Sequence, residues 1–212
     1  MSAKVLVFNG WAAGPETWDL CSFPHDWVFS YVEQLDGLPE RVMEDSDDVV
    51  LVGFSMGGAM AMRMLLKYPD KVRGAVFVSA SARMMEDKAT GWKGLSERRL
   101  AALKLGTDLL YGADPAPIYR ADNLNRGLEF LHEHDFRQEL RKAYQLPSAN
   151  CPLPKVAIFQ SEKDGIVRPN NAAFLKEIFP EAEVTTVPGC EHVLPVLVPG
   201  QIDAAVESVL RG

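Results

Sequence analysis

Short apolar runs alternate with longer amphipathic stretches along most of the chain. Several of the runs are apolar at nearly every position, as strands buried on both faces of a parallel sheet are. They are rich in β-branched or aromatic residues and are bounded by Gly, Pro, Asp or Ser, which predicts strands. The predicted strands are Val5–Phe8, Trp27–Val32, Val49–Phe54, Val72–Val78, Val156–Phe159 and Val184–Val187.

Helical patterns lie between or after these strands. Gly57–Tyr68 stops before Pro69, Asn170–Phe179 stops before Pro180, and Gln201–Arg211 lies at the end of the sequence. A proline directly after a helical pattern is a common stop signal, because it cannot continue the helix. Strands that alternate with helices predict an α/β fold with a mostly parallel sheet.

One segment, residues 81–150, interrupts this alternation. It contains no convincing strand and has helix-like stretches at Leu95–Leu105 and Arg126–Tyr144. We therefore expect a core made of residues 1–80 and 151–212, with residues 81–150 as a helical lid over one edge of the sheet. The whole chain is expected to form a single compact domain.

Composition narrows the class of protein. The 212 residues are 47% hydrophobic and 24% charged, which is typical of a globular protein. A net charge of −7 argues against nucleic-acid binding, which needs a positive surface. No apolar stretch approaches the roughly 18 residues of a membrane span, and no signal peptide is recognisable. Cys21, Cys151 and Cys190 form no CxxC pair, which indicates a reducing compartment. We expect a cytoplasmic protein.

The strongest local signal is the sequence Gly53-Phe54-Ser55-Met56-Gly57. A predicted buried strand runs into it and a predicted helix runs out of it. Strand, sharp turn and helix is the context of a nucleophile elbow, in which the serine hydroxyl is exposed at the strand's end. The glycines let strand and helix approach closely. The alternative is a tight turn with an ordinary surface serine, which the context disfavours.

A serine hydroxyl is a weak nucleophile until a base accepts its proton, and the base must itself be oriented. For an elbow serine the acid and then the histidine follow in the chain. His25 precedes Ser55, whereas His132 and His134 lie among charged residues of the predicted lid. His192 follows the last strand, where α/β sheets assemble their sites, and is the predicted base.

The predicted acid is Asp164, in the turn that follows the strand Val156–Phe159. Asp-Gly is also an ordinary turn sequence, and Glu162 is a weaker candidate in the same loop. Glu191 is too close to His192 in the chain to orient its imidazole well.

Two backbone N–H groups are predicted to form an oxyanion hole. One belongs to Met56, at the start of the elbow helix, and the other to Trp11, in the loop after the first strand. The Asn9-Gly10 pair is also a hairpin signal, but no strand follows it.

These motifs together resemble the α/β-hydrolase superfamily over essentially the whole chain. The similar segments are the oxyanion loop Asn9–Ala12, the elbow Gly53–Gly57, the acid turn Asp164-Gly165 and the histidine loop Gly189–His192. The resemblance implies the α/β-hydrolase fold, with the lid between core strands. Asn9 stands where the family usually has histidine, and the sequence begins at the strand that carries this loop. Neither departure removes a catalytic group.

The end of the predicted lid resembles a narrower group. Leu124–Leu131 and Asp135–Leu140, together with Asp164–Val167 and Pro169, are similar to the pimeloyl-acyl-carrier-protein methyl ester esterases of biotin synthesis. This resemblance implies hydrolysis of a methyl ester carried on a phosphopantetheine arm, with the carrier protein as a partner.

The distribution of charge along the chain indicates where such a carrier protein would dock. Residues 81–150 hold 11 of the 22 basic and 10 of the 29 acidic residues, a net +1, which leaves −8 for the rest. An acyl carrier protein is acidic, so docking needs a local basic surface. The lid residues that would supply it are Arg98, Arg99, Lys104, Arg126, Arg137, Arg141 and Lys142. An equally weighted alternative is that they are solvated and paired with Glu97, Glu133 and Glu139. Met84, Met85, Trp11, Trp92 and Tyr111 either line an acyl pocket or are plain core.

The sequence thus predicts a serine carboxylesterase that acts on a small-molecule ester and needs no cofactor or metal. The same residues would serve a general short-chain carboxylesterase or thioesterase, a lactonase, or an enzyme that cleaves a carbon–carbon bond. A non-catalytic small-molecule receptor on the same fold is a further alternative, which the complete set of catalytic groups disfavours.

Overall fold

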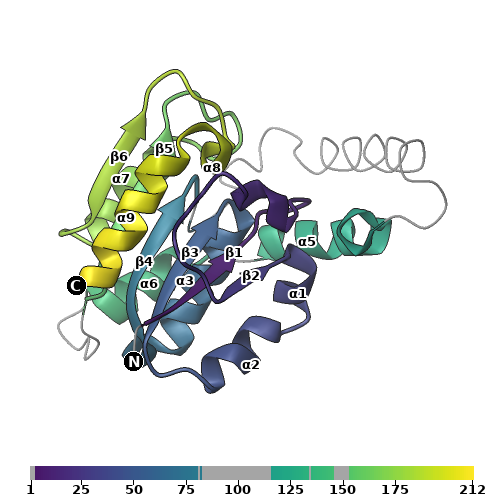
Figure 1. The fold of residues 1–212 in the computed structure, drawn as a ribbon, viewed down its shortest axis with the longest axis horizontal. Helices are drawn as coiled ribbons and strands as arrows, with labels where there is room; N and C mark the ends of the chain where they lie inside the picture. Colours follow the sequence, from purple (N-terminus) through teal and green to yellow (C-terminus); the bar gives the residue numbers. More distant parts are fainter. Residues whose placement is uncertain (1–2, 81, 83–115, 134, 146–152) are drawn as a thin grey trace.

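The computed structural model describes residues 3–80, 82, 116–133, 135–145 and 153–212. These residues form a six-stranded sheet in which every neighbouring pair is parallel, in the order β2-β1-β3-β4-β5-β6 (Figure 1). The strands are β1 (Lys4–Phe8), β2 (Trp27–Phe29), β3 (Val49–Phe54), β4 (Val72–Val78), β5 (Lys155–Ser161) and β6 (Glu183–Val187). The predicted α/β fold with a parallel sheet is confirmed.

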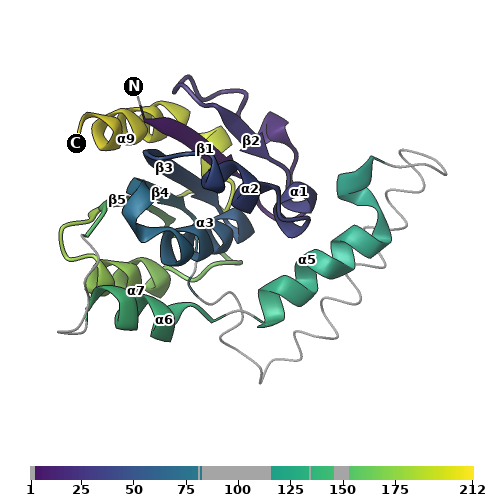
Figure 2. The same ribbon diagram turned by 90° about the horizontal axis from the view of Figure 1, so that it is seen from below.

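The sheet is covered by helices on both faces (Figure 2). One face packs against α1 (Tyr31–Leu35), α2 (Leu38–Glu44), α3 (Met56–Lys67), α5 (Ala121–Glu133), α6 (Arg137–Tyr144) and α7 (Asn170–Ile178). The other face packs against α8 (Leu194–Leu197), α9 (Pro199–Arg211) and the 3₁₀ turn Pro15–Trp18. Further 3₁₀ turns lie at Pro69–Lys71 and Pro117–Tyr119.

The apolar strand sequences follow directly from this double cover. Along β3, Val49 and Leu51 belong to the first core cluster, whereas Val50 and Val52 belong to the second. All four are 0% exposed, because successive side chains of a strand point to opposite faces. Full burial of one such side chain stabilises the fold by about 1.5–3 kcal/mol.

The predicted strand Trp27–Val32 is wrong in its second half. β2 ends at Phe29, and α1 begins at Tyr31. The Ser30 hydroxyl accepts a hydrogen bond from the Glu33 N–H, and the Glu33 carboxylate accepts one from the Ser30 N–H. This capping box supplies partners to N–H groups that a helix start leaves unpaired, so the chain turns into a helix there.

The predicted helix Arg126–Tyr144 is also wrong in its extent. α5 begins earlier, at Ala121, and the chain breaks between α5 and α6. At the break the Phe136 N–H donates to the Ala82 carbonyl at 2.8 Å, and Phe136 is 4% exposed. Leu124 in α5 and Leu140 in α6 are 0% exposed and belong to the same core cluster as the sheet.

The described part of the expected lid is therefore packed into the core. Leu95–Leu105 lies outside the described residues, and the division into core and lid stays a prediction. Within the part of the chain that the structure describes, no helix is both long enough and apolar enough to span a bilayer.

Strand register brings the candidate residues to one edge of the sheet. Phe8 pairs with Gly53, Phe54 pairs with Val78, and Val78 pairs with Phe159. The chain segments that follow these parallel strands consequently leave the sheet side by side.

Candidate active site

Ser55 forms the turn between β3 and α3. The strand ends at Phe54 and the helix begins at Met56, so Ser55 alone makes the connection, with φ 54° and ψ −118°. Its N–H donates to the Val78 carbonyl at 3.0 Å, and its carbonyl accepts from the Gly58 N–H at 3.0 Å. A non-glycine residue at such backbone angles costs about 1–3 kcal/mol and persists only where its surroundings enforce it.

Three glycines make this turn sterically feasible. A Cβ on Gly57 would lie 2.1 Å from the Phe8 carbonyl oxygen, and one on Gly58 would lie 2.1 Å from the Ala80 Cβ. A Cβ on Gly53 would lie 2.6 Å from the Gly58 Cα. The close strand–helix approach expected from the motif is therefore present, and it leaves no room for a side chain.

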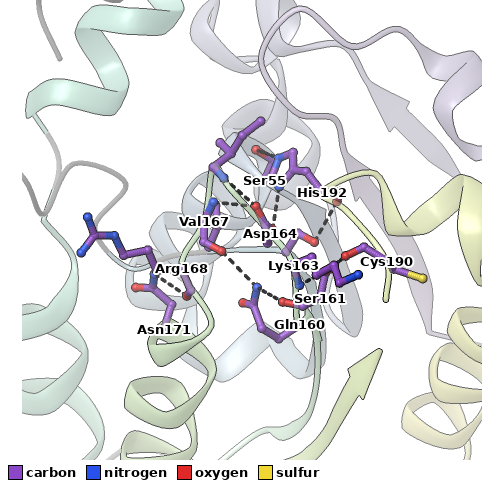
Figure 3. A network of polar contacts seen from close by, with 12 residues as sticks. Ser55, Gln160, Ser161, Lys163, Asp164, Val167, Arg168, Asn171, Cys190 and His192 are labelled. Atoms are coloured by element: carbon purple, nitrogen blue, oxygen red, sulfur yellow. Dashed lines mark hydrogen bonds and ion pairs between the residues drawn. The ribbon is translucent and has the colours of Figure 1, made fainter. Parts of the chain in front are cut away.

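The structure brings Ser55, His192 and Asp164 together in one hydrogen-bonded relay (Figure 3). His192 Nε2 lies 2.8 Å from Ser55 Oγ, and His192 Nδ1 lies 2.8 Å from Asp164 Oδ2. The Asp164 side chain is 0% exposed and that of His192 is 13% exposed. Residues from the ends of β3, β5 and β6 thus meet over distances at which a proton is transferred.

The other sequence candidates occupy different places. His25 is exposed, with Nδ1 3.3 Å from the Phe23 carbonyl. The Glu162 carboxylate accepts from the Gly189 N–H at 3.3 Å, and Glu191 is exposed. His134 and the side chain of His132 lie outside the described residues.

The surroundings of Asp164 keep it ionised. Burial by itself raises the pKa of this carboxyl group, but the hydrogen bond and charge of His192 lower it, as do the N–H groups of Val167 and Ile166. Both N–H groups donate to Oδ1 at 2.8 Å, which leaves Oδ2 for the imidazole. The net result is a pKa below the ordinary value for aspartate.

Two further serines hold the histidine loop, and sequence reasoning missed their role. Ser79 Oγ donates to the His192 carbonyl at 2.9 Å, and Ser161 Oγ donates to the Cys190 carbonyl. Ser79 is 0% exposed and has φ 46°. A polar residue directly after the apolar strand Val72–Val78 was the available signal, because the carboxyl ends of parallel strands carry the site.

The loop after β1 lies against the nucleophile. The Ala13 N–H donates to the Gly10 carbonyl at 3.1 Å, which closes a tight turn with Ala12 at φ 56°. A Cβ on Gly10 would lie 3.2 Å from the Ser55 Cβ. The hydrogen bond that closes such a turn involves neither N–H group of its two central residues, which here are Trp11 and Ala12. Met56 is the first residue of α3, so its N–H has no partner within the helix.

Comparison with known proteins agrees with this geometry. The model of the alpha/beta hydrolase family matches residues 7–205. The chain belongs to this family. It is similar to the pimeloyl-[acyl-carrier protein] methyl ester esterase of Klebsiella pneumoniae strain 342, with 24% identity over 84% of this chain and 82% of that protein. The esterase of the same name from Yersinia enterocolitica is 27% identical over 74% of this chain and 68% of that protein.

A solved structure shows the same fold. An alpha/beta hydrolase enzyme from a Medee basin deep-sea metagenome library superposes with a TM-score of 0.72 at 19% identity, over 100% of this chain and 90% of that one. The named relatives and this neighbour are esterases and hydrolases, and an ester-bond hydrolase is the enzyme class that they support.

In this alpha/beta hydrolase Asn9 anchors the loop after β1. Asn9 is 0% exposed, its Oδ1 accepts from Trp18 Nε1 at 2.7 Å, and its carbonyl accepts from Gln34 Nε2 at 2.9 Å. The side chain that replaces the family's usual histidine is therefore part of the interior at the base of the loop.

Three arginines of the expected basic surface are engaged in ion pairs, whereas Lys142 is exposed on α6. Arg126 pairs with Asp36 at 2.6 Å, and Arg141 pairs with Glu177 at 3.2 Å. Arg137 pairs with Asp135 at 3.0 Å. Other members of the expected basic surface and acyl pocket lie outside the described residues, namely Arg98, Arg99, Lys104, Met84, Met85, Trp92 and Tyr111.

The described residues were also considered for a metal site. No cluster of three or more His, Cys, Asp or Glu residues suited to a metal ion occurs there. The described cysteines, Cys21 and Cys190, are free thiols.

Proposed function

We propose that this alpha/beta hydrolase is a serine carboxylesterase with Ser55 as nucleophile, His192 as base and Asp164 as the orienting acid. The unbroken relay from Asp164 Oδ2 through the imidazole to Ser55 Oγ carries the proposal. A hydroxyl at 2.8 Å from an imidazole nitrogen loses its proton to that nitrogen as it attacks a carbonyl carbon.

The acylation step follows from these contacts. Ser55 Oγ forms a bond to the ester carbon while its proton passes to His192 Nε2, and the resulting imidazolium is stabilised by the Asp164 carboxylate. The N–H groups of Trp11 and Met56 hold the negative oxygen of the tetrahedral intermediate. Loss of one such donor costs about 10²–10³ in rate in a well-studied protease. His192 then returns the proton to the departing alkoxide, which leaves as the alcohol.

Deacylation repeats these steps with water. His192 removes a proton from the water molecule, the hydroxide adds to the acyl carbon, and the proton returns to Ser55 Oγ as the carboxylic acid leaves. In both steps His192 Nε2 carries the proton between Ser55 Oγ and the leaving alcohol or the attacking water.

The proposed substrate is the methyl ester of a pimeloyl chain on an acyl carrier protein. The names of the two esterase relatives support it, as does the similarity of α5 and α6 to that group. We also propose that residues 81–150 act as the lid that receives the carrier protein. Because Arg126, Arg137 and Arg141 are paired with acids, docking would depend more on the other four residues of this surface, Arg98, Arg99, Lys104 and Lys142. Free Cys21 and Cys190 are consistent with a reducing, cytoplasmic location.

Ser55→Ala tests the chemistry. We expect wild-type protein to hydrolyse short p-nitrophenyl esters and to gain one adduct with a fluorophosphonate probe, and the variant to lose both properties. Ser208→Ala, on α9, is the matched control and should keep both. Normal turnover by Ser55→Ala would overturn the mechanism, and a burst without steady-state turnover in wild type would indicate a receptor.

A substrate panel tests the finer proposal. We expect a higher kcat/KM for the carrier-bound pimeloyl methyl ester than for free short-chain esters. Preference for the free esters would reject the carrier-bound substrate while leaving ester hydrolysis intact. Faster cleavage of thioesters or lactones would assign a different bond to the same residues.

A further inference from the structure

The indole of Trp11 connects the loop after β1 to α5. Its Nε1 donates to the Leu124 carbonyl at 2.9 Å, across 113 positions of the sequence. The Trp11 ring is partly buried against the core cluster that contains Leu124 and Tyr31. The residue whose N–H is proposed to bind the oxyanion is therefore held, through its side chain, by a helix outside the sheet.

The surface of α5 is shaped to receive this ring. A Cβ on Gly127 would lie 2.4 Å from Trp11 Cδ1 and 2.9 Å from Trp11 Nε1. Glycine inside a helix costs about 1 kcal/mol relative to alanine. Here that cost is offset by direct contact between the indole and the helix backbone, one turn after the carbonyl that accepts its hydrogen bond.

Two further contacts hold α5 in register with α1. The Tyr31 hydroxyl donates to the Ile118 carbonyl at 2.6 Å, just before α5 begins. Burial raises the pKa of Tyr31, so the phenol keeps the proton that it donates. In α5 itself, Arg126 pairs with Asp36, at the end of α1, at 2.6 Å. The indole thus packs on a helix that has contacts of its own with α1, besides the contact with Trp11.

We propose that Trp11 is a positioning residue of the active site, and that the contact of its indole with Leu124 and Gly127 determines the position of the Trp11 N–H. The proposal rests on the serine esterase function proposed above. The indole and the backbone N–H belong to the same residue, so a shift of the ring moves the N–H directly. The tight turn that contains Trp11 also lies against Ser55. A small displacement of a catalytic group costs up to about 10²-fold in rate, so the position of α5 becomes part of the catalytic geometry.

Substitutions on both sides of the contact test this coupling. Trp11→Phe removes the indole N–H but keeps an aromatic ring, and Gly127→Ala pushes the ring off the helix. We expect each to lower kcat/KM by about 10- to 100-fold, mostly through kcat. Because both break one contact, the double variant should lose little more than Trp11→Phe alone. Asn125→Ala, an exposed position of α5, is the control and should resemble wild type.

Inhibitor binding separates positioning from general damage. A trifluoromethyl ketone adds to Ser55 and forms an oxyanion, whereas the corresponding methyl ketone binds mainly as a ground-state analogue. Each of the two substitutions should lower the affinity for the trifluoromethyl ketone by the same factor as it lowers kcat/KM. The affinity for the methyl ketone should stay unchanged. The proposal would be overturned if both inhibitors lost affinity equally, or if kcat stayed unchanged in the single variants. It would also be overturned if the losses in kcat/KM of the two single variants multiplied in the double variant. An inactive wild-type protein would instead overturn the proposed esterase function.

Discussion

At the scale of single residues, the side chains of Asp164 and His192 are held by defined hydrogen bonds. Asp164 divides its two oxygens between the backbone, which receives Oδ1, and His192, which receives Oδ2. Ser79 and Ser161 hold the two carbonyls on either side of Glu191. The imidazole is consequently fixed through both its ring and its backbone, as a base must be if it is to face Ser55 in the correct tautomer.

Asp164→Asn tests that tautomer. The amide oxygen of the new side chain would still accept from Ile166 and Val167, so its amide nitrogen would face His192 Nδ1 and require that nitrogen to be an acceptor. The proton would then be on Nε2, which no longer accepts from Ser55. We expect kcat for p-nitrophenyl esters to fall about 10⁴-fold, as in a well-studied serine protease, with KM nearly unchanged. A loss below about tenfold would contradict the role assigned to Asp164.

The lowered pKa of Asp164 also predicts how stability depends on pH. A carboxyl group with a depressed pKa in the folded state stabilises the fold at pH values above its unfolded pKa, which is about 3.9. That contribution is lost as the pH falls through the lower folded value. The difference in Tm between wild type and Asp164→Asn should be constant from about pH 8 to 5 and shrink below about pH 4. Thermal melts across that range measure it, and a difference that grows on acidification would contradict it.

At the scale of elements, the ends of helices and strands were harder to predict from the sequence than their interiors. The interiors of the strands were predictable because apolar runs buried on two faces are unambiguous. The run Trp27–Val32 favours a strand throughout, since Ser30 is its single polar residue and only the Ser30–Glu33 capping pair marks the change to helix. The break before Arg137 was not visible either, because it depends on the burial of Phe136 and its bond to Ala82.

Gly57→Ala tests the junction between β3 and α3. The new Cβ would overlap the backbone carbonyl of Phe8 at 2.1 Å, and a backbone in a central strand has nowhere to move. We expect a loss of more than about 3 kcal/mol in the free energy of unfolding. Gly200→Ala, at a helix position with nothing within 4 Å, is the control and should stabilise by up to about 1 kcal/mol. Urea denaturation measures both, and equal effects would contradict the steric argument.

At the scale of the whole molecule, helices from residues 121–144 share one core with the sheet. Leu124, Leu140 and Tyr144 belong to the cluster that includes β1, β3 and β4 side chains, and the Tyr144 hydroxyl donates to the Leu65 carbonyl at 3.1 Å. The described end of the expected lid therefore contributes to global stability, and its α5 contacts Trp11 in the loop after β1.

Leu140→Ala tests this shared core. Because Leu140 is 0% exposed, its truncation should cost about 2–5 kcal/mol and lower the midpoint of the whole unfolding transition. Leu197→Ala, at a side chain that is 50% exposed, should change stability by less than about 0.5 kcal/mol. Circular dichroism and tryptophan fluorescence in urea should report the same midpoint. A separate early transition in Leu140→Ala would show that α6 unfolds independently of the sheet.

The sequence by itself determined the class of fold and the identity of the residues that meet. Apolar runs predicted all six strands, although the end of β2 was misplaced. The order of Ser55, Asp164 and His192 along strand ends predicted their meeting, because parallel strands present their carboxyl ends at one edge. Only the tertiary structure decided what supports them. Ser79, Gln34 and Gly127 act through contacts between segments far apart in the chain. Such contacts depend on packing in three dimensions, which local patterns do not encode.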